Sequence, residues 1–408
     1  MTSGNPDFIH LLRRTANALE TRMDQARHRL SRTLGTSPAR QLAAYVGYSA
    51  GGRIHVSGRV LANAPYGGPL EHDGWWENLA NTFRRWESDE VPGASVTLRS
   101  GSQELTVLTD EEGFYQASFP CNSGSDTVIE WRTVEARTQG KDSEIEAAHP
   151  VMIPPREAEF GIISDLDDTV IHTGITSLLL AAKLTFLENA KTRKPLDGVA
   201  KLYQSFQRGF SDGPVNPLFY LSSSPWNLHD LLGDFLRLNE IPAGPLFLRD
   251  LGLDDRKFVT GKGHGHKLDQ TLELMAAYPA LQFVLVGDSG QQDASIYAEV
   301  AKLRPGRVRA IYIRDVDPGL LSNRDAAVEV AVELAAACGV PMILAADSEA
   351  IAEHARRIGL IPAKAEAAVS IEVATDQHLP ETGEQAVKDA VDSILPGLED
   401  KPGREKSE

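Results

Sequence analysis

Three aspartates follow the end of an apolar strand within one short stretch of the chain. Asp165, Asp167 and Asp168 come directly after the apolar run at 160–163. Carboxylates so close together repel one another unless a cation lies between them, and Mg²⁺ prefers oxygen ligands. In an extended chain alternate side chains point the same way, so Asp165 and Asp167 can face one substrate. One carboxylate could then attack while the other transfers protons; the competing interpretation is a solvated acidic turn.

A second apolar strand ends in acids further along the chain. Asp288 follows the run Phe283–Gly287, and Asp293 lies five residues later, where a helix is expected to begin. Two strands of one parallel sheet that both end in acids can hold a single Mg²⁺ from opposite sides. We therefore expect the two groups of acids to meet at one metal site.

Groups that could bind a phosphate stand between the two acidic strand ends. The apolar strand 218–221 ends in Ser222 and Ser223, and a helix opens after Pro225. Hydroxyls and free backbone N–H groups at the start of a helix can hold a phosphate, although serines at strand ends are also common without function. Lys267 opens the next expected helix, 268–278, and Lys262 is the second candidate for a phosphate-binding lysine.

The elements that must position these residues alternate between strand and helix from about residue 157. Helical patterns cover 176–191 and 197–208, and later segments predict a strand at 309–314, a helix at 325–338, a strand at 341–346 and a helix at 348–357. Such alternation is typical of a doubly wound parallel sheet, so the expected fold class is α/β. We assign this domain to residues 154–362.

Short alternating segments indicate a small β-sandwich-like domain over residues 41–153. Strands are expected at 53–61, 94–98 and 127–133, with a hairpin at 105–115 that turns at Gly113. An aromatic-rich helix is expected at 74–86. The polar run 139–146 and the prolines at 154–155 are predicted to form the domain boundary.

The two ends of the chain have opposite charge. Residues 1–40 carry seven Arg against three acids, a net charge of +4, and residues 7–33 have the apolar periodicity of an amphipathic helix. That helix could dock on an anionic lipid surface, or it could pack on the protein's own body. From Lys364 onward, 11 Asp and Glu stand against five Lys and Arg, a net charge of −6, so residues 363–408 are expected to form a disordered acidic tail.

Composition narrows the class of protein. The net charge of −16 over 408 residues argues against general nucleic-acid binding. Two cysteines are too few for a disulfide framework, which favours a reducing, cytoplasmic compartment. The sequence contains no run of 18 apolar residues, so contact with a membrane is expected to be peripheral.

The order of these motifs resembles the haloacid dehalogenase (HAD) superfamily. The resemblance rests on Asp165-Leu166-Asp167-Asp168-Thr169, the strand leading to Ser222, Lys267, and Gly287-Asp288 with Asp293. Within that superfamily, the stretches at 164–172, 221–226 and 286–293 are similar to the phosphatidate phosphatase domain of the fungal actin-patch type. The similarity covers about residues 157–320, and residues 40–150 look like the small domain that often precedes it.

The resemblance implies a HAD-like fold and a role for each matched residue. Asp165 would be the nucleophile that forms an aspartyl-phosphate, and Asp167 the general acid and base. Thr169, Ser222, Ser223 and Lys267 would hold the phosphate. Mg²⁺ would bind Asp165, Asp167, Asp288 and Asp293, with Asp293 either a direct ligand or a residue that orients the ligands from behind. The expected reaction is hydrolysis of phosphatidate to diacylglycerol and phosphate.

Two other functions remain open at this point. The same chemistry could act on a soluble phosphomonoester or a phosphoprotein, because phosphate-binding residues do not read the rest of the substrate. The chain could also be a non-catalytic binding protein on the same fold. Retention of Asp165, Asp167 and Asp288 together argues against the non-catalytic alternative.

Overall fold

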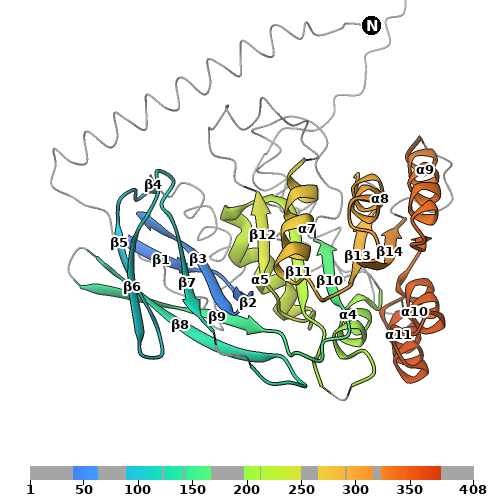
Figure 1. Cartoon of the computed structure of the whole chain (residues 1–408), viewed down its shortest axis with the longest axis horizontal. Helices are drawn as coiled ribbons and strands as arrows, with labels where there is room; N and C mark the ends of the chain where they lie inside the picture. Colours follow the sequence, from blue (N-terminus) through green and yellow to red (C-terminus); the bar gives the residue numbers. More distant parts are fainter. Residues whose placement is uncertain are drawn as a thin grey trace, which may run out of the picture.

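The computed structural model describes residues 40–62, 89–121, 124–140, 143–166, 197–211, 213–249, 265–289, 292–315 and 323–377. These residues form two sheets that lie side by side (Figure 1). In the described residues, no helix is both long and apolar enough to cross a membrane.

The second sheet is parallel throughout and contains six strands. Its strands are β10 (Gly161–Asp165), β11 (Leu218–Pro225), β12 (Leu246–Arg249), β13 (Phe283–Asp288), β14 (Val308–Arg314) and β15 (Met342–Ala345). Their spatial order is β12-β11-β10-β13-β14-β15. The direction of chain progress therefore reverses between β10 and β13, and at such a point a crevice opens at the carboxyl ends of the strands.

Helices cover both faces of the parallel sheet. They are α4 (Val199–Arg208), α5 (His229–Leu238) preceded by η1 (Trp226–Leu228), α7 (Gly265–Ala277), α8 (Asp293–Leu303), α9 (Asn323–Ala337), α10 (Ser348–Arg357) and α11 (Ala363–Gln377). Alternate strand residues point to opposite faces, so Ile162 packs with α4, α5, α10 and α11, whereas Ile163 packs with α7, α8 and α9. The expected α/β class and parallel sheet are confirmed.

The first sheet is a mixed, nine-stranded sheet. Its strands are β1 (Arg40–Ala44), β2 (Gly47–Ala50), β3 (Arg53–Ala62), β4 (Asp89–Glu90), β5 (Ser95–Ser100), β6 (Gln103–Leu108), β7 (Phe114–Pro120), β8 (Glu130–Gln139) and β9 (Glu144–Ile153). One core cluster contains Leu98 of β5, Tyr115 of β7 and Val134 of β8, so the sheet curves around a common interior.

The region is mostly β, as expected for the β-sandwich-like domain, and its strands form one continuous hydrogen-bonded sheet. The segments 40–44 and 47–50 were not predicted as strands, yet they join the two halves. Together they pair with β3 in the antiparallel direction, and β2 also pairs with β9 in parallel. One ladder therefore runs through the whole region.

Two local expectations in this region are wrong. The turn at Gly113 exists, with a φ of 78°, but β6 pairs with β5 and β7 pairs with β3, so 105–115 is not a hairpin. The polar run 139–146 is not a boundary, because it spans the end of β8 and the start of β9, which pair with each other. Polar residues occur there because half of each strand faces solvent.

The first part of the predicted disordered tail, residues 363–408, is a helix in the structure. Residues 363–377 form α11, and its Val369 and Val373 are buried in the same cluster as α4. The apolar positions are sparse among acids and alanines, so the composition concealed the helix. The predicted segments 7–33, 74–86, 176–191 and 378–408 lie outside the described residues.

Candidate active site

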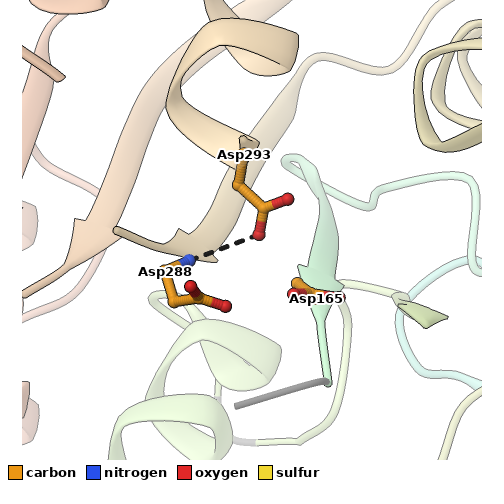
Figure 2. A group of neighbouring side chains, drawn as sticks. All are labelled: Asp165, Asp288 and Asp293. Carbon is orange, nitrogen blue, oxygen red and sulfur yellow. Dashed lines mark hydrogen bonds between the residues drawn. The ribbon is translucent and has the colours of Figure 1, made fainter. Parts of the chain in front are cut away.

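The two acidic strand ends lie next to each other at the centre of the parallel sheet. Asp165 is the last residue of β10, and Asp288 is the last residue of β13, the neighbouring strand. Asp293 is the first residue of α8 and turns back toward them, as Figure 2 shows. Three carboxyl groups therefore meet at the point where the strand order reverses.

Lys267 links two of these carboxylates. Its Nζ lies 2.9 Å from Asp165 Oδ2 and 2.9 Å from Asp293 Oδ1, and the side chains of the three residues are 7%, 2% and 0% exposed. The lysine projects from the first turn of α7, which packs against β11 and α8. The sequence prediction placed Lys267 at a helix start, and the structure brings it to Asp165.

Asp293 is held in place by backbone as well as by charge. Its Oδ2 accepts a hydrogen bond of 3.3 Å from the Asp288 N–H (Figure 2). Its position in the first turn of α8 is favourable because the helix N-terminus carries partial positive charge. Gly287 allows the close approach, since a Cβ there would lie 2.6 Å from the Asp293 Cβ and Oδ2.

The cluster keeps Lys267 charged despite its burial. Burial on its own lowers the pKa of Lys267, but the attraction of Asp165 and Asp293 outweighs it and raises that pKa above its ordinary value. Three buried carboxyl groups thus share one ammonium group in this cluster. An excess of carboxyl groups over cationic groups favours the binding of a further cation.

The donor set fits Mg²⁺. One ligand oxygen from each of Asp165, Asp288 and Asp293 lies within 4.8 Å of the other two. Oxygens that bind one octahedral Mg²⁺ at about 2.1 Å lie roughly 3 to 4 Å from one another. Small side-chain rotations would bring the three aspartate oxygens to these distances. All three donors are oxygens, which suits Mg²⁺ better than a softer metal.

Of the other residues predicted for the site, the structure describes only the two serines of β11. Ser222 follows Leu221, the register partner of Asp165, and its buried Oγ accepts a 2.9 Å hydrogen bond from the Ser224 N–H. Ser223 lies in the same strand, β11. Asp167, Thr169 and the alternative lysine Lys262 lie outside the described residues.

Sequence reasoning did not single out two polar groups beside the cluster. Arg314 ends β14 opposite Asp288, and Tyr203 of α4 hydrogen-bonds Ser164 at 2.6 Å between hydroxyls. Burial raises the pKa of Tyr203 to about 12, and the charge of Asp165 raises it while that of Arg314 lowers it, so both charges lie near its hydroxyl. Arg314 could have been found from the sequence by the pattern that identified the aspartates, a charged residue at the carboxyl end of an apolar strand.

The central part of the chain matches a known family. Residues 160–315 match the model described as the catalytic domain of phosphatidate phosphatase APP1. Over 155 residues the chain is 31% identical to phosphatidate phosphatase APP1 of Saccharomyces cerevisiae, covering 38% of this chain and 25% of that protein. It is 25% identical over 217 residues to an uncharacterised protein of Schizosaccharomyces pombe, covering 52% of this chain and 35% of that one.

The matched region is thus a minor part of each of these relatives, because the chain spans 25% to 35% of their length. Among solved structures, a carbohydrate acetylesterase from Xanthomonas citri covers 78% of this chain, and this chain covers 75% of that one, at 11% identity and a TM-score of 0.26. That score is too low to support an argument about fold. The segment 160–315, which holds Asp165, Ser222, Lys267, Asp288 and Asp293, is thus the part of this chain that is similar to the catalytic domain of phosphatidate phosphatase APP1.

Proposed function

We propose that this chain is a Mg²⁺-dependent phosphatase that hydrolyses phosphatidate through an aspartyl-phosphate on a HAD-like, doubly wound domain. The observation that supports it most is the buried cluster of Asp165, Asp288, Asp293 and Lys267 at the centre of the sheet edge. The match of residues 160–315 to a phosphatidate phosphatase catalytic domain supports the choice of substrate.

In the proposed first step, a carboxylate oxygen of Asp165 attacks phosphorus and the bond from phosphorus to the glycerol oxygen breaks. Asp167 gives its proton to the departing alkoxide, which becomes the hydroxyl of diacylglycerol. In the second step water attacks the aspartyl-phosphate while Asp167 takes a proton from it. Phosphate leaves and the carboxylate of Asp165 is restored.

The remaining residues bind and orient the phosphate. Lys267, Ser222, Ser223 and Thr169 hold the phosphoryl oxygens, and the ammonium of Lys267 keeps its contact with Asp165. Asp165, Asp167, Asp288 and Asp293 would hold Mg²⁺, which supplies charge neutralisation at the phosphoryl group when bound. Tyr203 fixes Ser164 next to the nucleophile.

A phosphate-release assay tests the proposal. We expect the full-length protein with Mg²⁺ to release phosphate from phosphatidate in detergent micelles faster than from soluble phosphomonoesters or phosphopeptides. Asp165→Asn is nearly isosteric but cannot form the acyl phosphate, so it should lose more than about a thousandfold in kcat while its circular dichroism is unchanged. Preference for a soluble ester would reassign the substrate, and activity of the Asp165→Asn variant within about tenfold of wild type would remove Asp165 as nucleophile.

Access to a lipid substrate requires the acidic protein to approach an anionic surface. We propose that the basic segment 7–33 makes this peripheral contact from the cytoplasmic side. Each arginine near such a surface contributes about 1 kcal/mol, and the contribution falls with salt. Deleting residues 1–36 should therefore weaken sedimentation with anionic vesicles while hydrolysis of a soluble phosphoester is retained. Equal sedimentation of both proteins would assign the segment to packing on the protein instead.

A further inference from the structure

Aromatic side chains from the mixed sheet meet others from the start of η1 and α5, beside residues 222–225. These residues are the irregularly paired end of β11, which is predicted to bind phosphate, and we call them the Ser222 turn. The ring of Tyr45, between β1 and β2, stacks on that of Trp226 with centroids 4.6 Å apart and lies 4.2 Å from the ring of His229. Phe114 of β7 meets Trp226 edge-on at 5.7 Å. We call Tyr45, Phe114, Trp226 and His229 the aromatic bridge. Trp226 lies four residues after Ser222, so the aromatic bridge contacts the chain directly after the Ser222 turn.

On the β side, Tyr45 is fixed from inside the core. The ring of His149 is fully buried, with Nδ1 3.0 Å from the Tyr45 carbonyl oxygen and Nε2 2.9 Å from the Tyr115 hydroxyl. A carbonyl only accepts, so Nδ1 carries the proton and the Tyr115 hydroxyl donates to Nε2. The backbone at Tyr45 is therefore tied to the interior of the mixed sheet.

Phe114 is fixed in a similar way. The guanidinium of Arg59 lies 4.5 Å from the centre of the Phe114 ring. Arg59 is itself buried and held by a 2.7 Å hydrogen bond to the Glu112 carbonyl and a 3.0 Å ion pair with Glu90. Both β-domain members of the bridge thus rest on ordered partners.

In the parallel sheet, the pairing of β11 with β12 becomes irregular just before Trp226, the first residue of the aromatic bridge on this side. The register of β11 with β12 shifts between Leu221 and Pro225, so strand pairing alone does not define residues 222–224. Trp226 packs against the core of the parallel sheet on one side and against Tyr45 on the other. The position of Trp226 therefore determines where the turn ends.

We propose that the mixed sheet is a positioning element of the active site: Tyr45 and Phe114 hold Trp226, and Trp226 holds the turn of Ser222 against the phosphate. This rests on the proposed function, since it assigns phosphate to that turn. The turn would contact phosphoryl oxygens both in the bound substrate and in the transition state. Its misplacement should therefore raise KM and weaken phosphate binding more than it lowers kcat.

The experiment uses the full-length protein with Mg²⁺ and two probes, inorganic phosphate by calorimetry and para-nitrophenyl phosphate by kinetics. Tyr45→Ala should weaken phosphate binding and raise KM by about tenfold, with kcat changed less than about threefold. Tyr45→Phe keeps the stacked ring and should restore both values. If the alanine variant does not fold, Tyr45→Leu removes the stacking with a smaller loss of apolar contact and is expected to shift both values the same way.

Tyr278→Phe is the matched control, because it removes another contact between the two sheets, the 2.8 Å hydrogen bond to the Ser49 carbonyl. It should lower the melting temperature without changing phosphate affinity. The inference is overturned if Tyr45→Ala binds phosphate as wild type does, or if Tyr278→Phe weakens binding equally. A wild-type protein that neither binds phosphate nor hydrolyses the ester overturns the proposed function together with the inference, whereas an active wild type with an unaffected Tyr45→Ala overturns the inference alone.

Discussion

Gly287 lies at the end of β13, against the side chain of Asp293, where no larger residue fits without displacing that side chain. It lets Asp293 fold back onto the Asp288 N–H, and a single added methyl would collide with the Asp293 side chain at 2.6 Å. The geometry of three carboxylates and a lysine therefore depends on a residue that contributes no functional group. Its hydrogen side chain makes the carboxylate cluster possible.

Gly287→Ala should weaken Mg²⁺ binding by about tenfold or more, because Asp293 is pushed from its place beside Lys267. Calorimetric titration of the protein with MgCl₂ measures the change. Gly233→Ala is the control, since a Cβ there meets nothing within 4 Å and the position is inside α5. It should leave Mg²⁺ binding unchanged and stabilise the helix slightly. Equal Mg²⁺ affinity in wild type and Gly287→Ala would show that Asp293 is not part of a metal site.

The residues of the site were predictable to the extent that each follows an apolar strand or opens a helix. Asp165 and Asp288 end strands, Ser222 follows the register partner of Asp165 in β11, and parallel pairing brings these residues to one edge. What the sequence could not supply is the pairing between groups distant in the chain. The link from Lys267 to Asp165 and Asp293 depends on how α7 packs, and the role of Trp226 depends on a residue 181 positions earlier, Tyr45.

Among the elements, α4 is notable for taking its N-terminal cap from another helix. Its N-cap residue, Gly198, has no side chain to offer. The N–H of Gly198 instead donates to Asp376 at 2.9 Å and that of Lys201 to Glu372 at 2.7 Å, both on α11. Local sequence rules look for a cap next to the helix, so they could not have assigned this role to residues more than 170 positions away.

Glu372→Ala should lower the free energy of unfolding by about 1 kcal/mol, the usual cost of losing a helix cap. Urea unfolding followed by circular dichroism gives the value. Glu353→Ala on the exposed side of α10 removes the same charge without such a contact and should stay within about 0.5 kcal/mol of wild type. A Glu372→Ala protein as stable as the Glu353→Ala protein would show that the contact of Glu372 with α4 does not stabilise the fold.

For the whole molecule, His149 makes stability depend on pH. Burial lowers the pKa of His149 to about 4, from an ordinary value of 6.5, although the hydrogen bond to Tyr45 opposes the shift. Between these two values the unfolded chain binds a proton that the folded chain does not. The contribution of neutral His149 to stability is therefore present above about pH 6.5 and lost as the pH falls toward 4.

The expected loss from this residue is about 3 kcal/mol over that range. Histidine NMR shifts test the cause directly: the imidazole of His149 should stay neutral at pH 5, where an exposed histidine is mostly charged. Assignment comes from the signal absent in His149→Gln, whose unfolding free energy should also depend less steeply on pH between 6.5 and 4. A His149 signal that titrates near pH 6.5 would contradict the prediction.

The contacts between the two sheets also determine how the chain can be divided. The region that matches the catalytic-domain model is 160–315, but the rings of Phe219 and Phe247 are covered by Tyr48, and that of Trp226 by Tyr45, from outside this region. At the other end, α4 is capped from α11, beyond residue 315. A fragment cut to the region of homology would thus lack both its aromatic cover and a helix cap. We therefore expect a stably folded fragment of this chain to begin near residue 40 and to end no earlier than residue 377.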